Sequence, residues 1–397
     1  MSSTAPSRPR RLGTVRREGS RVMPLELFFD LVFVLALTQC TALMSDEPTW
    51  TGLGKGLLIL GVLWWAWVGY AWLTSVVEPE ETLVRFTIFG AMAAMLVVAL
   101  SIPQAFGDWA LLFAVAYAVV RFAQIALFAL ASSEDPQLRH SLIIGLTWST
   151  LVGAGLLVGA AFADGPLQGA LWALALLIDL GGPFLFGVEG WRLEPGHFAE
   201  RHGLIVIIAL GESIVAIGVG AEFGLDAGIV TAAVIGIAIA AALWWLYFDI
   251  VALVAERRLS DAAPGAERNA IARDSFSYLH LPMIAGIVLL ALGIKKVLGH
   301  VGDPLHAVPA TALLGGTALY LLAHVAFRWR NVHRFSTQRL VCAAVLLALI
   351  AAAVEIPALV TLAIAAGVLA ALIAYETVHF AELRERLRHQ LAAGHEG

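Results

Sequence analysis

The feature that most constrains this chain is a series of long apolar runs that follow one another, with short connections, from residue 25 to residue 378. A helix needs about 20 mostly apolar residues to cross the hydrocarbon core of a bilayer. Lipid offers the backbone no hydrogen-bond partners, so runs of this length must be helical. A single run could be the core helix of a soluble protein, but a dozen in series could not. The sequence therefore predicts an all-α integral membrane protein.

We expect about twelve transmembrane helices, because twelve runs in the 397 residues are long enough. Only 14% of the residues are charged, against roughly 25% in soluble globular proteins. The connections are short, apart from the N-terminal tail, residues 254–274 and about the last twenty residues. The predicted spans are residues 25–43, 56–76, 84–102, 109–131, 142–163, 167–188, 203–221, 227–253, 275–296, 309–327, 339–355 and 358–378.

Basic residues are divided unequally between the two predicted faces of the membrane. The face that carries the N-terminal tail receives 21 of them, whereas the other face has only Lys55, Lys295 and Lys296. Lys and Arg are in excess in cytoplasmic loops, so we expect both termini in the cytoplasm. The first 21 residues are Arg-rich, and no short apolar segment with a cleavage site follows them. We therefore expect a retained tail rather than a signal peptide.

The order of the sequence motifs predicts that one six-helix unit occurs twice. Three pairs of segments match in the same order: 26–37 with 200–210, 63–69 with 243–249, and 86–100 with 279–292. Three pairs of polar residues continue the match: Arg121 with His324, Arg139 with Arg339, and Asp179 with Glu376. Because six is an even number, both units enter the membrane in the same direction, and we expect parallel repeats.

This repeat defines the predicted domains. We expect a basic cytoplasmic tail at residues 1–22, a first six-helix repeat at 23–196, and a second at 197–380. A C-terminal cytoplasmic tail is expected at residues 381–397. No segment is long enough for a separate soluble domain.

Charged side chains within the predicted spans are the main functional candidates, because a charge at a helix centre costs about 2.5–3.5 kcal/mol on insertion scales. At mid-depth lie Arg121, Asp179 and Glu212. Arg121 can pair with either acid. One interpretation is a structural ion pair that holds helices together. The other is a substrate or proton site at which two acids compete for one arginine, so that one carboxylate carries a proton.

A second set of ionisable residues lies nearer the predicted cytoplasmic ends of the spans: Glu26, Asp30, Asp249, His280, His324 and Glu376. Glu26 and Asp30 are four residues apart and share a helix face, so they need a nearby cation. Possible partners are Arg201, His202, His280 and His324. Glu26 is alternatively a helix N-terminal acid, and each histidine alternatively a packed side chain. Together these residues predict a polar vestibule open to the cytoplasm.

Other residues within the spans have a packing interpretation. Cys40 and Cys342 fall in apolar runs and are expected to pack as small hydrophobic side chains. Glycines at 211, 218 and 220 predict a tight crossing of the seventh span with a neighbour. Tryptophans at 64, 65, 67, 244 and 245 either pack or line a cavity. No span has a His-x-x-x-His spacing, so we expect no metal site and no cofactor.

Three short segments resemble a known family. Residues 24–33, 200–204 and 210–214 place acids in otherwise apolar helices, and the chain resembles the bacterial low temperature requirement protein A family from about residue 20 to 385. The resemblance implies a multi-pass bacterial inner-membrane protein connected, by the family's name, with growth in the cold. It marks Glu26, Asp30, Arg201 and Glu212 as signature positions, and it implies no substrate or catalytic cycle.

The sequence is compatible with three functions. The leading hypothesis is a secondary transporter or permease that uses intramembrane carboxylates, with protons or a small solute as partners in addition to the lipid bilayer. The second is a structural or sensory membrane protein for cold adaptation. The third is a membrane-embedded lipid-modifying enzyme, for which acids and histidines could serve general acid–base chemistry. We expect no enzyme, because no nucleophile motif or phosphate-binding glycine loop is present. We expect no nucleic-acid partner, and a homo-oligomer is compatible with the sequence.

Overall fold

The computed structural model describes residues 21–77, 81–131, 146–185, 191, 193–221 and 224–382. Within these ranges the chain is helical and contains no β-strand. The predicted tail up to residue 20, Arg139, the start of the fifth span, the end of the sixth span and the tail after residue 382 lie outside the described residues.

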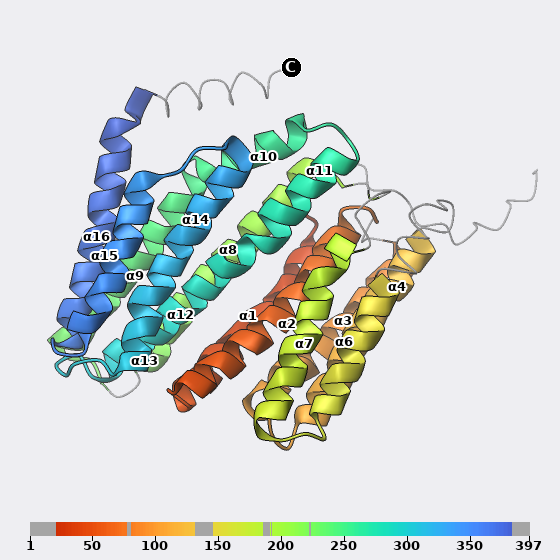
Figure 1. Ribbon diagram of the computed structural model, residues 1–397, viewed down its shortest axis with the longest axis horizontal. Helices are drawn as coiled ribbons and strands as arrows, with labels where there is room; N and C mark the ends of the chain where they lie inside the picture. The colour runs from red at the N-terminus through yellow and green to blue at the C-terminus, as the bar shows by residue number, and fades with distance from the viewer. Residues whose placement is uncertain are drawn as a thin grey trace, which may run out of the picture.

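The described residues of the first half of the chain include six α-helices (Figure 1). They are α1 (Pro24–Asp46), α2 (Trp50–Thr74), α3 (Thr82–Ser101), α4 (Ala110–Ala131), α6 (Thr147–Ala160) and α7 (Gly165–Leu185), with a 3₁₀ turn at Ile102–Gln104 after α3.

The second half contains more helical segments, because several of its spans are interrupted. They are α8 (Pro195–Gly220), α9 (Ala227–Phe248), α10 (Val251–Asp261), α11 (Ala266–Ile271), α12 (His280–Gly299), α13 (Ala307–Ala310), α14 (Gly316–Val332), α15 (Thr337–Ala353) and α16 (Ala358–His379). π-Helical turns at Ala272–Tyr278 and Thr311–Gly315 join α11 to α12 and α13 to α14.

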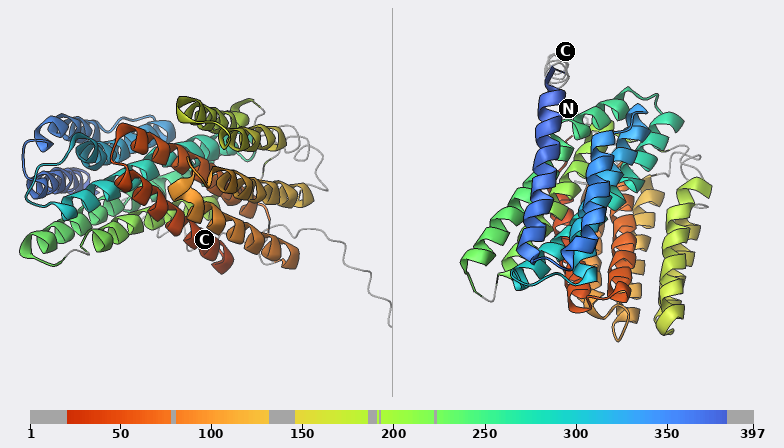
Figure 2. Two further views of the ribbon diagram at one scale, coloured as in Figure 1. Left: turned by 90° about the horizontal axis from the view of Figure 1, so that it is seen from below. Right: turned by 60° about the vertical axis from the view of Figure 1, so that its left-hand side comes forward.

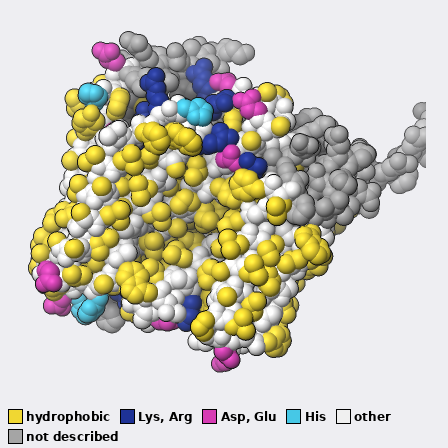
Figure 3. All heavy atoms as spheres, viewed as in Figure 1, with side chains coloured by type: hydrophobic (Ala, Val, Ile, Leu, Met, Phe, Trp, Pro, Cys, Tyr) yellow, Lys and Arg dark blue, Asp and Glu magenta, His cyan; other side chains and the backbone are white. Residues whose placement is uncertain are grey.

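The helices have the length and composition of membrane spans. Among the described residues, 10 helical runs are long and apolar enough to cross a bilayer, and α6 and α15 are shorter apolar helices. Apolar side chains cover the broad middle of the face shown in Figure 3, and charged side chains gather at its two ends. The prediction of an all-α multi-pass membrane protein is confirmed. The count of twelve spans, their repeat and their orientation stay predictions.

The two halves lie side by side, and each has a similar pattern of helix contacts (Figures 1 and 2). In the first half α3 packs against α1 and α4, and α6 packs against α4 and α7. In the second half α12 packs against α8 and α14, and α15 packs against α14 and α16. The contact between the halves is made mainly by α1 with α8 and α12. We call the contact between α1 and α8 the seam.

The helices of the seam run parallel to each other. Glu26 of α1 contacts Arg201 of α8, which is 175 residues later. Further along, Thr38 of α1 contacts Glu212 of α8, which is 174 residues later. Because the sequence separation is nearly the same at both contacts, the two helices point in the same direction. Charged side chains therefore lie at two levels of the seam. Glu26 and Arg201 are at one level, and Glu212 is at the other.

The predicted connection 254–274 is largely helical, which corrects the sequence interpretation. The eighth span ends at Phe248 rather than residue 253, and α10 and α11 occupy most of the connection. In α10 the apolar side chains of Ala255 and Leu259 are buried, while Glu256 and Arg257 are exposed. This amphipathic pattern is typical of a helix that packs one face on the protein.

The π-helical turn before α12 brings polar groups into the interior. Pro282 lacks a backbone N–H and so weakens the regular ladder there. The carbonyl of Ser277 accepts the indole N–H of Trp64 at 2.7 Å, and the carbonyl of Ser275 lies 3.0 Å from Nδ1 of His280. Side chains of α2 and α12 thus satisfy carbonyls that a regular helix would use itself.

The predicted glycine crossing of α8 is wrong for two of its three residues. A methyl group at Gly211 or Gly218 would meet no atom within 4 Å, whereas one at Gly220 would meet Cβ of Leu298 at 2.8 Å. A glycine crossing at which two helix backbones approach closely is found between α12 and α14 instead. There, a Cβ on Gly286 would lie 2.6 Å from the carbonyl oxygen of Gly316. Neighbouring helix backbones, rather than the number of glycines in a motif, decide where helices approach closely.

The two cysteines are free. Cys40 is fully buried in the apolar core, and Cys342 is partly buried against it. The expectation that they pack as small hydrophobic side chains is confirmed.

Candidate functional site

The first cluster of charges joins the beginnings of α1 and α8 around Arg201, whose side chain is completely buried. Its guanidinium donates hydrogen bonds to Glu26 at 3.0 Å and to Asp30 at 2.7 Å, so one cation faces two carboxylates. Trp67 of α2 donates its indole N–H to the same oxygen of Asp30 at 2.9 Å. The hydroxyl of Thr74, also on α2, accepts another N–H of Arg201 at 3.0 Å. Arg201 is therefore the cation expected beside the two acids, and it connects three helices.

Glu26 fills both of the roles that the sequence left open. Its Oε2 accepts the backbone N–H of Met23 at 2.8 Å, which satisfies one of the free donors at the start of α1. Its Oε1 faces Arg201 and lies 2.8 Å from Nε2 of His197. His197 was not predicted, because it lies on the first turn of α8, before the predicted span 203–221. Its spacing of four residues from Arg201, on the same helix face, is the signal that could have found it.

The second cluster pairs Arg121 of α4 with Asp179 of α7. The guanidinium lies 3.4 Å from the carboxylate, and both side chains are buried. Arg121 also donates to the hydroxyl of Thr150 at 3.0 Å and to the side chain of Gln124 at 3.1 Å. Tyr117 donates its hydroxyl to the second oxygen of Asp179 at 3.3 Å. The partner of Arg121 is thus Asp179, and the charge is surrounded by hydrogen-bonding groups, as a buried ion pair requires.

The third cluster is centred on Arg339 of α15. Its guanidinium donates two hydrogen bonds to Glu376 of α16, each at 2.9 Å, in the bidentate geometry that is strongest for this pair. A third N–H lies 2.6 Å from Nδ1 of His324 on α14. Gln338 donates its amide to Glu376 at 3.0 Å. His324 and Glu376 were predicted site residues. Arg339, which lies between them, was named in the sequence analysis only as the position in the second repeat that corresponds to Arg139.

Glu212 has different surroundings from these acids. Its side chain is 2% exposed, and its Oε2 accepts the hydroxyl hydrogen of Thr38 across the seam at 2.6 Å. Thr41 lies one turn further along α1. In the part of the chain that the structure describes, no basic side chain lies within 4.0 Å of the carboxylate. The expected competition of Glu212 for Arg121 is wrong, because Arg121 lies on α4, in contact with α7, and Glu212 faces α1.

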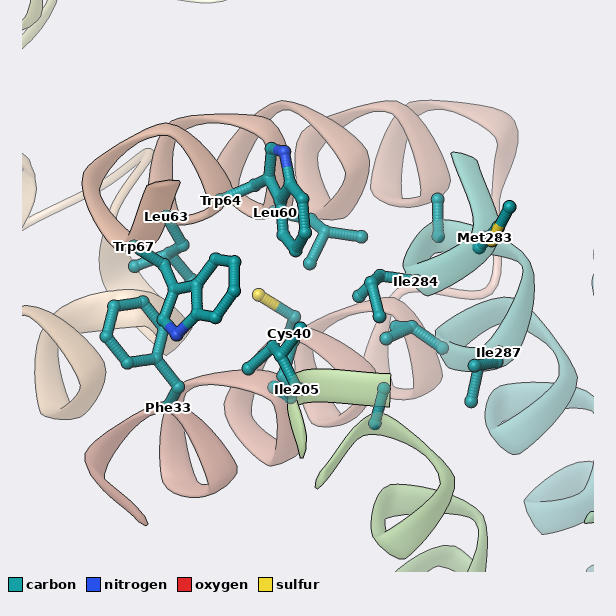
Figure 4. Packing of buried hydrophobic residues seen from close by; sticks show 14 of the residues in the cluster. Phe33, Cys40, Leu60, Leu63, Trp64, Trp67, Ile205, Met283, Ile284 and Ile287 are labelled. Carbon is teal, nitrogen blue, oxygen red and sulfur yellow. The ribbon is translucent and has the colours of Figure 1, made fainter. Parts of the chain in front are cut away.

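Tightly packed apolar side chains separate the level of Arg201 from that of Glu212 (Figure 4). Phe33 of α1 and Ile205 of α8 lie one turn beyond Asp30 and Arg201 along their helices. Residues of α2 and α12 complete the packing, and those labelled in the figure are Leu60, Leu63, Trp64, Trp67, Met283, Ile284 and Ile287. The interior between the two levels is therefore filled by side chains.

The tryptophans predicted either to pack or to line a cavity do both. Trp64, Trp65 and Trp67 of α2 are buried and pack, and two of them donate hydrogen bonds. Trp244 and Trp245 of α9 are 45% and 37% exposed. Trp245 also lines a cavity among α9, α10, α14, α15 and α16.

The predicted vestibule is only partly present. A cavity of about 360 Å³ is lined by Asp249, Arg339 and Glu376 among other residues. Glu26 and Asp30 do not line it, because they are closed off by Arg201 in the first cluster. The six predicted residues are thus divided among separate groups, since each lies on a helix whose rotation is set by its own packing.

Buried aromatic and imidazole rings connect the first and third clusters. His280 of α12 lies 2.8 Å from the hydroxyl of Tyr247 on α9. The ring of His202 lies 5.1 Å from that of His280 and 5.0 Å from that of Trp67, centre to centre. The ring of Tyr247 lies 5.9 Å from that of His324. His202 and Tyr247 were not predicted as site residues, and they complete a continuous row of rings across the interior.

The arrangement of acids in apolar helices can now be compared with known proteins. The family model of the bacterial low temperature requirement A protein (LtrA) matches residues 21–374. The chain belongs to this family. The match includes both helices of the seam, and the resemblance seen in the sequence is confirmed.

Other comparisons agree with this membership and add no activity. An uncharacterised protein of Rhizobium meliloti (strain 1021) is 32% identical over 309 residues, which is 75% of this chain and 74% of that protein. No solved structure matches the chain. The membership therefore shows the type of protein, and the chemistry has to be argued from the site.

The four signature positions of the LtrA resemblance belong to two different sites. Glu26, Asp30 and Arg201 form one cluster in which both acids pair with the arginine. Glu212 lies three turns further along α8, accepts a hydrogen bond from the hydroxyl of Thr38 on α1, and feels the charge of Lys295 on α12 from beyond ion-pair distance. Both sites lie in the seam.

Proposed function

We propose that the protein is a secondary transporter or permease, and that Glu212 binds the transported or coupling ion within the membrane. The observation that carries this proposal is the difference between Glu212 and the other acids described within the spans. Glu26, Asp30, Asp179 and Glu376 each face an arginine. Glu212 faces the hydroxyl group of Thr38.

The physical argument starts from the cost of burying a charge. An ionised carboxylate in an apolar interior is stable only when it is paired or well hydrogen-bonded. Glu212 is buried and its hydrogen-bond partner is neutral, and the cation that acts on it, Lys295 of α12, lies beyond ion-pair distance. A proton or a small cation is therefore the close partner that its charge lacks. Carboxylate and hydroxyl oxygens are suitable ligands for either. Acids in this situation within membranes commonly mark ion pathways and proton relays.

The position of Glu212 in the seam supports the same proposal. We propose that the twelve helices form two parallel six-helix repeats with both termini in the cytoplasm of a bacterial inner membrane. The parallel course of α1 and α8 and the similar contacts within each half support the repeat. In transporters built from repeats, binding sites lie near the interface between them, and Glu212 lies at such an interface.

The closed packing in the seam gives the proposal a mechanism. Apolar constrictions can stop the passage of ions by excluding water. In this structure buried apolar side chains, among them Phe33 and Ile205 of Figure 4, lie along the seam between the levels of Arg201 and Glu212. We propose that transport requires α1 and α8 to move relative to each other, which exposes Glu212 first to one side and then to the other.

The proposal is tested by flux measurements on purified protein in liposomes that contain a pH-sensitive dye. Proton, sodium and potassium gradients are imposed in turn on the wild type and on Glu212→Gln. The matched control is Glu355→Gln, because Glu355 is an exposed acid between α15 and α16. We expect flux in the wild type and the control, and its loss in Glu212→Gln. Absence of flux in the wild type under every gradient would favour a structural membrane protein, whose paired clusters hold the helices together.

A further inference from the structure

The cavity beside the third cluster lies outside the seam and has no part in the proposed transport. Its volume is about 360 Å³, which is within the range of pockets that bind small molecules. Its walls come from the ends of α9, α14 and α16 and from the amphipathic helix α10. Most of the lining is apolar, and it includes Trp245, Val251, Val254, Phe327 and Phe380.

The charged side chains of the cavity favour an anion. Arg339 is neutralised by its bidentate contact with Glu376. Arg328 and Arg334 also line the cavity, Arg328 half-buried and Arg334 exposed. In the described part of the chain, neither of these two arginines has an ion-pair partner. They outweigh Asp249, the remaining acid of the lining, so the cavity presents a net positive charge.

The surroundings of the cavity are those of a membrane interface. The neighbouring surface of α16 exposes Tyr375 and Val378, and that of α9 exposes Trp244. Both helices are among the membrane spans. Arg328 and Arg334 lie where α14 ends and the chain turns into α15, at the end of the molecule where basic side chains gather in Figure 3. The cavity thus combines apolar walls at the depth of acyl chains with guanidinium groups at the depth of headgroups.

We propose that this cavity binds an anionic phospholipid from the membrane leaflet in which Arg328 and Arg334 lie. The headgroup phosphate accepts hydrogen bonds from the two guanidinium groups, which are well shaped for phosphate oxygens. An acyl chain lies along the apolar wall that contains Trp245 and Val254. Basic pockets between transmembrane helices are a recognised way of holding anionic headgroups.

A lipid fits the cavity better than a free anion does. A free phosphate would use the two arginines and leave the apolar walls in contact with water. An acyl chain covers those walls, and burial of apolar surface is favourable by about 25 cal/mol per Å². The amphipathic helix α10 forms one wall, so the bound lipid connects this surface helix to α14 and α16.

The test uses the purified full-length protein in a zwitterionic detergent, with native mass spectrometry to count bound lipids. Phosphatidylglycerol and phosphatidylcholine of equal chain length are added to the wild type, to Arg328→Gln and to Arg334→Gln. The matched control is Arg257→Gln, because Arg257 lies on the same end of the molecule, is exposed and does not line the cavity. We expect selective binding of one phosphatidylglycerol, weakened about fivefold by each substitution in the cavity and unchanged in the control.

Three results would overturn the proposal. Equal binding of the two lipids would show that the headgroup charge is not recognised. Equal weakening in Arg257→Gln would show general attraction to a basic surface instead of a built site. Competition by inorganic phosphate at the same concentration as the lipid would assign the site to a free anion. Arg334 is exposed, so its substitution leaves the fold intact and keeps the test decisive. Lipid counting is independent of flux, and the result holds whether or not the protein is a transporter.

Discussion

The two ends of the seam bury carboxylates in opposite ways. At one end, Glu26 and Asp30 share Arg201, and Trp67 and Thr74 add one hydrogen bond each. At the other end, Glu212 has a hydroxyl partner and no arginine among the described residues. The first arrangement fixes the helices, because separating any member leaves a buried charge. In the second arrangement, the carboxylate of Glu212 has no partner of opposite charge within ion-pair distance among the described residues. Within a single helix contact, the chain thus separates stability from ion binding.

The largest expected effect comes from removing the shared cation. We expect Arg201→Met to lower the free energy of unfolding by about 3–5 kcal/mol, because two buried carboxylates lose their partner. Thermal unfolding in detergent, followed by tryptophan fluorescence, measures this. The matched control Arg257→Gln removes an exposed arginine paired with Asp261, and its effect should stay within about 0.5 kcal/mol. Equal stability of the two variants would mean that the paired end of the seam does not fix the helices.

A smaller loss is expected at the third cluster. Arg339→Gln leaves Glu376 without its bidentate partner, but the acid borders a cavity that water can enter. We expect a loss of about 2 kcal/mol, less than at Arg201, because solvent screens the remaining charge. The double variant Arg339→Gln with Glu376→Gln should recover part of this loss in the same unfolding assay. No recovery would show that the arginine acts through packing alone.

The sequence predicted the helices and the important acids better than it predicted their partners. The apolar runs and the positions of Glu26, Asp30 and Glu212 are local properties, and the structure confirms them as buried residues of long helices. Arg121 pairs with Asp179 rather than with Glu212 because of the way α4 and α7 are rotated in the bundle. Side-chain packing decides that rotation. No local pattern contains that information.

The cavity and the row of rings were missed for a related reason. The cavity exists because the chain breaks after Phe248 and α10 turns along the end of α14. The sequence interpretation treated residues 254–274 as a connection, so it placed no wall there. Tyr247 was not among the predicted residues, and its contact with His280 requires the crossing of α9 and α12.

At the other end of the seam, removing the charge of Glu212 should change the stability of the protein only slightly. We expect Glu212→Gln to change the free energy of unfolding by less than about 1 kcal/mol, because glutamine keeps an oxygen for the hydroxyl of Thr38 and carries no charge. The unfolding assay used for Arg201→Met gives the direct comparison. A loss as large as that of Arg201→Met would show that Glu212 is itself a structural residue.

The smallest effect on flux is expected for the hydroxyl partner. Thr38→Val removes one hydrogen bond to Glu212 and conserves the shape of the side chain, so the expected loss of stability is about 1 kcal/mol. Flux should fall only partly, since the carboxylate remains. Thr87→Val serves as the control, because Thr87 is a half-buried residue of α3 whose hydroxyl donates only to its own helix, at the carbonyl of Leu83. A complete loss of flux with full stability would mean that Thr38 binds the ion directly.

The assignment of Glu212 as the ion-binding residue is tested most directly by the flux per folded molecule of Glu212→Gln and Glu212→Asp, measured in the same liposomes as the wild type. Each sample is first checked for equal unfolding temperature and equal reconstitution. The account predicts that Glu212→Gln loses flux at least about tenfold, while Glu212→Asp keeps part of it because the carboxylate is retained. Wild-type flux in Glu212→Gln, from protein of wild-type stability, would contradict the assignment of Glu212 as the ion-binding residue.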